Sequence, residues 1–247
     1  MIRRAVKKLV LKMGYEINRV DWTYNPRSVE FKTKLYEQTY AAARRHWQQT
    51  KETVLFLKQK YEKPLFGKVH ILDMFHLLAQ CISPADIALG TVSQLTHVLQ
   101  VAESMEEDGI KDPDFIMAGL IHDLGKVLLL TDEKPENIIG GNKPIGEYEE
   151  GIGLDNCLFT WNHDEFVYTR LKDYLPYHMS WLIRYHGLLI SDCERYMNKR
   201  DRELCEKYLV CFQKYDKETK CLYRIPEKGL AGYKDMILSY FPKPIDF

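Results

Sequence analysis

The chain has 247 residues, of which 45% are hydrophobic, and its 35 basic and 35 acidic side chains give a formal net charge of zero. This balance excludes the strongly basic surface that attracts nucleic acid, so we expect no nucleic-acid partner. No stretch reaches about 18 consecutive apolar residues, so the sequence predicts no transmembrane segment.

Residues 1–30 are predicted to form an N-terminal extension. The first 15 residues include five lysines or arginines but no long apolar core and no small-residue cleavage site, so a signal peptide is not expected. We expect a solvated helix there, with weak contact to a membrane surface as the alternative. The six dispersed cysteines form no CxxC motif and are expected to be reduced thiols, which favours a cytoplasmic location.

Helical periodicity dominates residues 31–247, which predicts one all-α domain, expected to be a monomer. Residues 131–154 are rich in glycine and predict a long loop of the kind that often lines a binding site. The tail from Ile225 is mixed and contains proline. The predicted helices span residues 31–62, 69–82, 91–107, 113–124, 156–172, 177–186 and 193–215.

Polar and proline residues mark the ends of two of these helices. Thr91 or Ser93 is expected to cap the helix that follows it. Asp112 precedes Pro113, a pairing typical of a helix start. Gly125 is predicted to end the same helix.

An adjacent pair, His122-Asp123, lies at the end of this predicted helix and supplies an imidazole nitrogen and a carboxylate. Neighbouring helical residues point about 100° apart, so one ion can bind both side chains, or the carboxylate can reach a second ion. Buried imidazoles and carboxylates are costly unless they are paired or bind a metal, and a shared metal site removes these costs together. Four further residues of the same types have large apolar neighbours, which indicates burial: His97, His163, His186 and Asp216.

The number and type of these six donors predict a centre with two metal ions. Four histidines and two aspartates exceed the three or four ligands of a single zinc site. Mixed imidazole and carboxylate ligands suit iron, manganese or zinc. Six protein ligands with one bridging carboxylate leave coordination positions open, and open positions are what catalysis requires.

The other histidines are weaker candidates. His46 lies in a charged helix and is expected to be solvated. Asp164 follows His163 in a second His-Asp pair and is expected to lie behind the ligands or on the surface. The histidines without a comparable carboxylate partner are His70, His76 and His178.

At these residues the sequence resembles the myo-inositol oxygenase family, a branch of the HD-domain superfamily. Together with the helix around His97, the matching segments cover about residues 70–240. The Trp-Asn-His-Asp-Glu and Ile-Arg-Tyr-His segments are more specific than the His and His-Asp pattern shared with HD phosphohydrolases. The segments that look like the family, in its order, are residues 119–126, 153–168, 175–186 and 212–220.

The resemblance implies an HD-domain-like helical bundle with a non-haem, mixed-valent Fe(II)/Fe(III) centre. It also implies O2 as co-substrate and a small polyol or diol as substrate, which is cleaved at a C–C bond. The family converts myo-inositol to D-glucuronate. By position, one iron would be bound by His97, His122, Asp123 and Asp216. The other would be bound by His163 and His186, with Asp123 as the bridge.

The same resemblance implies roles in substrate binding and catalysis. Lys126 and Lys220 match pocket positions of the family, where a cation can donate hydrogen bonds to substrate hydroxyls. Gly140 and Gly141 match a loop that contacts the substrate. Lys126 and Asp123 are expected to take part in catalysis.

Several substrate contacts of the family differ here. An acidic segment of the family is replaced by residues 80–86, Gln-Cys-Ile-Ser-Pro-Ala-Asp. Its Gly-Asp pair is replaced by Gly140-Gly141, and a hydroxyl side chain is replaced by Gly187. A site that binds hydroxyls discriminates strongly, so we expect a changed substrate preference. The alternatives are an HD-type metal-dependent phosphohydrolase and a non-catalytic protein that retains the metal.

Overall fold

The computed structural model describes residues 40–83, 86, 89 and 92–247. The predicted N-terminal extension and its basic helix lie outside these residues. The regular secondary structure of the described part is helical apart from a short antiparallel sheet, in which β1 (Lys68–Val69) pairs with β2 (Ile245–Asp246). The predicted all-α fold is confirmed, and within the described part no helix is long and apolar enough to cross a membrane.

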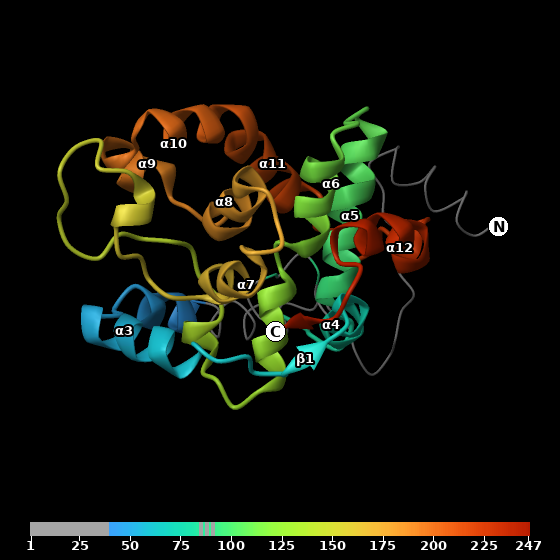
Figure 1. Ribbon diagram of the computed structural model, residues 1–247, viewed down its shortest axis with the longest axis horizontal. Helices are drawn as coiled ribbons and strands as arrows, with labels where there is room; N and C mark the ends of the chain where they lie inside the picture. The colour runs from blue at the N-terminus through green and yellow to red at the C-terminus, as the bar shows by residue number, and fades with distance from the viewer. Residues whose placement is uncertain (1–39, 84–85, 87–88, 90–91) are drawn as a thin grey trace.

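Two neighbouring helices of the described part begin where their capping residues predict. Ser93 caps α5 (Gln94–Glu107), because its side chain accepts a hydrogen bond from the backbone of Thr96. Asp112 caps α6 (Pro113–Ile121) in the same way, with Pro113 at the first position. The two helices lie side by side (Figure 1) and pack closely. A Cβ on Gly119 would lie 3.1 Å from the side chain of Val101.

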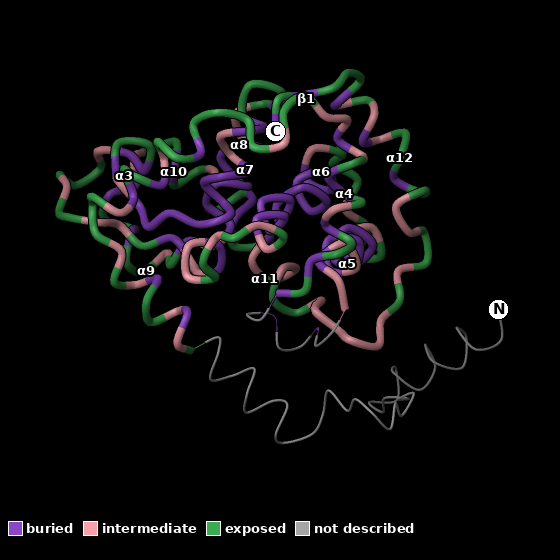
Figure 2. The backbone as a smooth tube through the Cα atoms, turned by 90° about the horizontal axis from the view of Figure 1, so that it is seen from below, coloured by how far each residue is buried: buried purple, intermediate pink, exposed green. Residues whose placement is uncertain are grey.

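Some of the remaining helices pack against this pair, and the others lie farther away on one side of it. Figure 2 shows that buried residues are concentrated in the central helices, while the outer helices alternate between buried and exposed positions. In chain order the others are α3 (Lys51–Lys60), α4 (Ile71–Leu78), α7 (His163–Leu171), α8 (Tyr177–Tyr185), α9 (Ile190–Cys193), α10 (Lys199–Leu204), α11 (Val210–Glu218) and α12 (Gly229–Tyr240).

Three predicted helices differ from the structure. The described part of the helix predicted over residues 31–62 is broken, since Thr50 caps a new helix at Lys51. The helix predicted from residue 156 begins at His163, because the side chain of Asn162 accepts hydrogen bonds from the first turn. The helix predicted over residues 193–215 begins instead at Lys199, since α9 ends at Cys193 and Asn198 caps α10.

A π-helical turn, Cys205–Leu209, connects α10 to α11. The tail predicted as mixed contains α12, which packs against α5 and α6. Gly125 does not end a helix but lies within a 3-10 helix, Leu124–Leu130. Glycine is needed there for a different reason: a Cβ would lie 2.1 Å from the carbonyl oxygen of His163.

The prediction that His46 is solvated is wrong. Its side chain is fully buried, with Nδ1 3.0 Å from the carbonyl oxygen of Glu136 and Nε2 2.7 Å from that of Gly141. The ring also lies where a Cβ on Gly140 would be, 2.4 Å away. His46 therefore fixes the loop that contains Gly140 and Gly141.

Replacement of His46 by alanine is expected to lower the free energy of unfolding by roughly 3 kcal/mol, because it leaves a cavity and removes contacts to two carbonyl groups. Urea unfolding monitored by circular dichroism measures this change. His76→Ala, at an exposed position on α4, is the matched control and should change stability by less than about 0.5 kcal/mol. Equal stability of the two variants would contradict the structural role of His46.

Candidate metal centre

The six predicted metal ligands converge at one place. His97 lies in the first turn of α5, and Asp216 lies on α11. His122 and Asp123 follow the last residue of α6, His163 begins α7, and His186 follows the last residue of α8. Five helices, α5, α6, α7, α8 and α11, therefore each bring at least one predicted ligand to this place, although these residues are far apart in the sequence.

The donor atoms form two groups, and Asp123 belongs to both. His97, His122, Asp123 and Asp216 offer atoms that all lie within 4.8 Å of one another, as do Asp123, His163 and His186. In the second group, Asp123 Oδ1 lies 2.9 Å from Nε2 of His163. The other oxygen of the same carboxylate, Oδ2, lies 3.4 Å from Nε2 of His97 and of His122. One carboxylate thus faces both groups.

Backbone carbonyl groups orient three of the imidazole rings. Nδ1 of His122 lies 2.9 Å from the carbonyl oxygen of Gly119, and Nδ1 of His186 lies 2.9 Å from that of Ile183. Nδ1 of His163 lies 2.6 Å from the carbonyl oxygen of Ile138. An N–H at Nδ1 that donates to a carbonyl leaves Nε2 as the metal-binding atom, which is the usual arrangement of metal-bound histidine.

The residues present fit a metal centre. Nε2 of His122 is buried and has no hydrogen-bond partner among the described residues, although it faces Asp123 and Asp216. A buried polar atom without a partner is costly, and a bound cation would remove that cost. The phenyl ring of Phe212 packs against the His122 ring at a centroid distance of 5.2 Å, so the centre has an apolar wall.

The charges within the centre oppose one another. Burial by itself lowers the pKa of His122 and of His163, but the carboxylates of Asp123, Asp164 and Asp216 raise the two pKa values to about 9 and about 10. Burial, assisted by the charge of Lys220, lowers the pKa of His97 to about 4. Without metal, the carboxylates therefore hold protons on two of the imidazoles at neutral pH.

Metal binding is consequently expected to release about two protons per chain at pH 7, because ligand histidines must be neutral. An ordinary histidine, with a pKa of about 6.5, would release few at that pH. The apparent metal affinity should increase as the pH rises from 6 to 8. Calorimetric titration of metal-free protein with Fe(II) under anaerobic conditions, in buffers of different ionisation enthalpy, measures the number of protons. Release of less than half a proton would contradict the expectation.

A cavity of about 160 Å³ opens beside the centre. This is smaller than the roughly 300–1,000 Å³ of a typical drug-sized site, so it suits a small, compact ligand. All four residues predicted to bind substrate line it: Lys126, Gly140, Gly141 and Lys220.

Lys126 is buried, and three acceptors surround its ammonium group. Nζ lies 2.8 Å from Asp86, 2.8 Å from Asp123 and 2.9 Å from Gln94. Burial alone would lower the pKa of Lys126, but the two carboxylates raise it above its usual value. The three donors of this ammonium group are therefore occupied, and Lys126 orients Asp123 from behind.

Lys220 has fewer partners. Its Nζ lies 3.0 Å from Asp86 and 3.0 Å from Asp216. Burial opposes its charge, but these carboxylates raise the pKa of Lys220 above its usual value, so it stays protonated. An ammonium group has three donors, so Lys220 can serve both carboxylates and still donate one hydrogen bond into the cavity.

Asp86 and Gln94 are site residues that no sequence pattern indicates. Asp86 is buried and contacts both lysines, and Nε2 of Gln94 donates to it over 3.0 Å. Although residues 80–86 replace the acidic segment of the family, the last of them, Asp86, still places a carboxylate in the cavity. No local pattern marks Asp86, since the interaction depends on cations 40 and more than 100 positions away.

Asp164 lies in the centre and not on the surface. It is fully buried, and Oδ1 is 3.0 Å from Nε2 of His163. Asn162 links the same turn to the loop, because its side-chain nitrogen donates to the carbonyl oxygen of Gly140 and to Asn142, each over 2.8 Å. The start of α7 thus connects a predicted ligand to the cavity wall.

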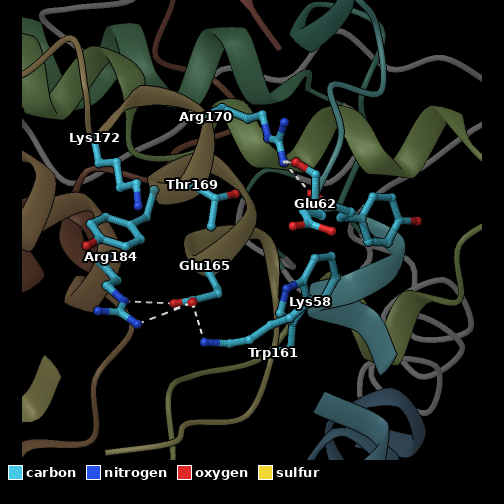
Figure 3. Close-up of a pocket in the computed structure, with 10 residues that line it drawn as sticks. Lys58, Glu62, Trp161, Glu165, Thr169, Arg170, Lys172 and Arg184 are labelled. Atoms are coloured by element: carbon cyan, nitrogen blue, oxygen red, sulfur yellow. Dashed lines mark hydrogen bonds and ion pairs between the residues drawn. The ribbon is translucent and has the colours of Figure 1, made fainter. Parts of the chain in front are cut away.

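A larger cavity of about 430 Å³ is lined by residues of α3, α7 and α8 but contains none of the predicted ligands. Figure 3 shows Glu165 between Lys58 and Arg184, to which it is joined by ion pairs of 2.8 and 2.7 Å. These charges are paired with one another. The smaller cavity, which is lined by four of the six predicted ligands, is the better candidate for chemistry.

The fold and the site together define an all-helical protein with a buried His/Asp cluster that can bind metal. Comparison with known proteins is more specific. Residues 34–147 and 140–247 match the family described as Myo-inositol oxygenase. The chain belongs to this family, whose members are oxygenases and therefore oxidoreductases. The family predicted from the sequence is confirmed.

Individual inositol oxygenases are similar in sequence to this chain over most of their length. Inositol oxygenase 1 of Arabidopsis thaliana is 31% identical over 96% of this chain and 89% of its own. Probable inositol oxygenase of Oryza sativa subsp. japonica is 32% identical over 80% of this chain and 76% of its own. Inositol oxygenase of Rattus norvegicus is 23% identical over 80% of this chain and 82% of its own.

Proposed function

We propose that this chain is a non-haem di-iron oxygenase that uses O2 to cleave a C–C bond of a polyol or diol. Myo-inositol is the first candidate substrate, and D-glucuronate is the product expected from it. The observation that supports this most directly is the position of Asp123, which faces both groups of candidate ligands. Membership of the myo-inositol oxygenase family and the inositol oxygenases among its relatives support the reaction class.

In this proposal His97, His122 and Asp216 bind one iron, and His163 and His186 bind the other, with Asp123 between them. Iron in a site with open positions supplies Lewis-acid activation of a hydroxyl group and the redox capacity to use O2. We expect a mixed-valent Fe(II)/Fe(III) pair, as the family resemblance implies. Lys126 holds Asp123 in place through the ion pair at 2.8 Å.

Around the substrate, the proposal gives each cavity residue a distinct task. Lys220 donates a hydrogen bond to a substrate hydroxyl. The backbone of Gly140 and Gly141 forms the wall of the cavity, and no side chain there takes up space. Burial of the predicted ligands, most of them less than 6% exposed, excludes bulk water from the reacting groups.

The phosphohydrolase alternative is not favoured. The residues that line the small cavity include two lysines but no arginine among those described, and both lysines contact carboxylates. A phosphate group would meet these carboxylates at close range, which is unfavourable for a second anion. Neutral hydroxyl groups meet no such repulsion.

The cytoplasmic location and the monomeric state are supported by fewer observations than the reaction. All six cysteines are free, which supports the proposed cytoplasmic location. The monomeric state and the weak N-terminal membrane contact stay predictions.

The proposal is tested by oxygen uptake. Protein purified without oxygen and loaded with iron is assayed with myo-inositol and a set of other polyols and diols. It should consume O2 with at least one of them and release an acidic product. It should release no phosphate from phosphate esters. His163→Ala should lower bound iron towards one per chain, and His76→Ala, at an exposed histidine, should not. Phosphate release without oxygen consumption would refute the proposal.

A further inference from the structure

One wall of the small cavity consists of glycines from two segments. Gly140 and Gly141 come from the loop before α7, and Gly187 follows α8. A Cβ on Gly187 would lie only 2.7 Å from Oδ2 of Asp164, and one on Gly141 would lie 2.6 Å from the carbonyl oxygen of Gly187. Real Cβ atoms do not approach so closely, so a side chain at either position would force its neighbour to move. Because Gly187 has no side chain, no Cβ presses on Oδ2 of Asp164, which is itself buried.

Asp164 is the carboxylate of this cavity whose oxygens are least satisfied. Neither of its oxygens accepts a hydrogen bond from a described residue, and the side chain is fully buried. Oδ1 lies near Nε2 of His163 and of His186, at 3.0 and 3.5 Å. Oδ2 has no such neighbour within the described part of the chain. A buried carboxylate oxygen without a donor is costly, which points to a donor that arrives with a ligand.

The other carboxylates of the cavity are already engaged. Asp86 pairs with Lys126 through Oδ2 and with Lys220 through Oδ1. Asp123 faces four histidines and Lys126, and Asp216 faces His97, His122 and Lys220. Of these carboxylates, Asp164 is the one in the described part of the chain whose two oxygens are both buried without a hydrogen-bond partner, which makes Oδ2 a candidate acceptor for a ligand.

We propose that Oδ2 of Asp164 accepts a hydrogen bond from one particular hydroxyl group of the substrate, and that Gly187 keeps this position open. The inference rests on the proposed function, because it assumes a polyol. A hydroxyl is a donor, and its hydrogen bond to a carboxylate is stronger than one between neutral groups. Asp164 thus determines specificity on the wall where Gly141 offers no side-chain acceptor.

The test removes the two partners of this hydrogen bond separately. Iron-loaded wild-type and Asp164→Ala protein are titrated in a calorimeter, without oxygen, with myo-inositol and with analogues that each lack one hydroxyl. Asp164→Ala should weaken binding of myo-inositol by about 10- to 100-fold. One analogue should bind wild type and variant with similar affinity, because it lacks the hydroxyl that Asp164 contacts. Asp192→Ala, at an exposed position on α9, should change nothing.

Two further measurements distinguish a substrate contact of Asp164 from a metal contact. Gly187→Ala places a methyl group against Oδ2 and should weaken binding of the same hydroxyl without removing the carboxylate. Iron content should remain two per chain in both variants. A loss of iron in Asp164→Ala would make Asp164 a metal ligand and overturn the proposal, as would equal weakening for every analogue. Wild-type protein that binds iron but none of the polyols would refute the proposed function itself.

Discussion

Asp123→Asn protein is expected to bind fewer than two iron ions per chain and to lose O2-dependent turnover by at least roughly 100-fold. Substitution of groups that only support metal ligands already costs about 10- to 100-fold, and Asp123 is a candidate ligand of both ions. Its two oxygens face different histidines, Oδ1 facing His163 and Oδ2 facing His97 and His122. Asparagine offers one oxygen and no charge, so it cannot serve both groups.

Metal analysis and electron paramagnetic resonance measure this outcome. The resonance of a coupled iron pair should disappear from Asp123→Asn protein, and the remaining iron should behave as isolated ions. Asp192→Asn, an exposed position on α9, is the matched control. Two equivalents of iron with unchanged magnetic coupling would show that Asp123 is not the bridge.

Lys126→Met is expected to lower the free energy of unfolding of the metal-free protein by about 3–5 kcal/mol, since it leaves buried carboxylates without their cation. Asp86 and Asp123 both lie 2.8 Å from Nζ, and both are buried. Methionine has a similar length but cannot neutralise either charge. Urea unfolding at neutral pH measures the loss.

Bound metal should reduce this loss, because an ion at the centre neutralises Asp123 from the other side. Urea unfolding of iron-loaded Lys126→Met protein therefore should show a smaller loss in the free energy of unfolding than the metal-free variant does. Lys199→Met, whose wild-type side chain is 92% exposed, should have no measurable effect. A loss below about 1 kcal/mol in metal-free Lys126→Met would mean that the ion pairs of Lys126 contribute little.

The candidate ligands could be predicted from sequence because they form a joint set of histidines and aspartates with large apolar neighbours, in segments that resemble one family. His122-Asp123 follows an apolar helix that begins at Asp112, and that helix is present with its predicted cap. His186 likewise follows a helix preceded by proline. Such short-range patterns predict the structure well, because the direction of a ligand side chain at a helix end depends on the adjacent helical turn.

The missed features depend on contacts between distant segments. His46 lies among polar residues, yet its ring is buried against a loop 90 and 95 positions later. Asp86 lies in a segment without periodicity, and Lys126 and Lys220 determine its position. Gly125 resembles a helix stop, but the close carbonyl oxygen of His163 requires it. Sequence patterns describe neighbours along the chain, and these three residues depend on neighbours in space.

The π-helical turn Cys205–Leu209 has a geometric consequence for this centre. Such a turn contains about one residue more than a regular turn, and each helical residue advances the direction of a side chain by about 100°. Before the turn, Asp201 accepts hydrogen bonds from Leu154 and Trp181, and after it Asp216 reaches the metal centre. An uninterrupted α-helix would put these two aspartates out of phase by about one residue. The turn therefore allows one continuous helical segment to direct Asp201 toward Leu154 and Trp181 and Asp216 toward the metal centre, which a regular helix of the same length could not do.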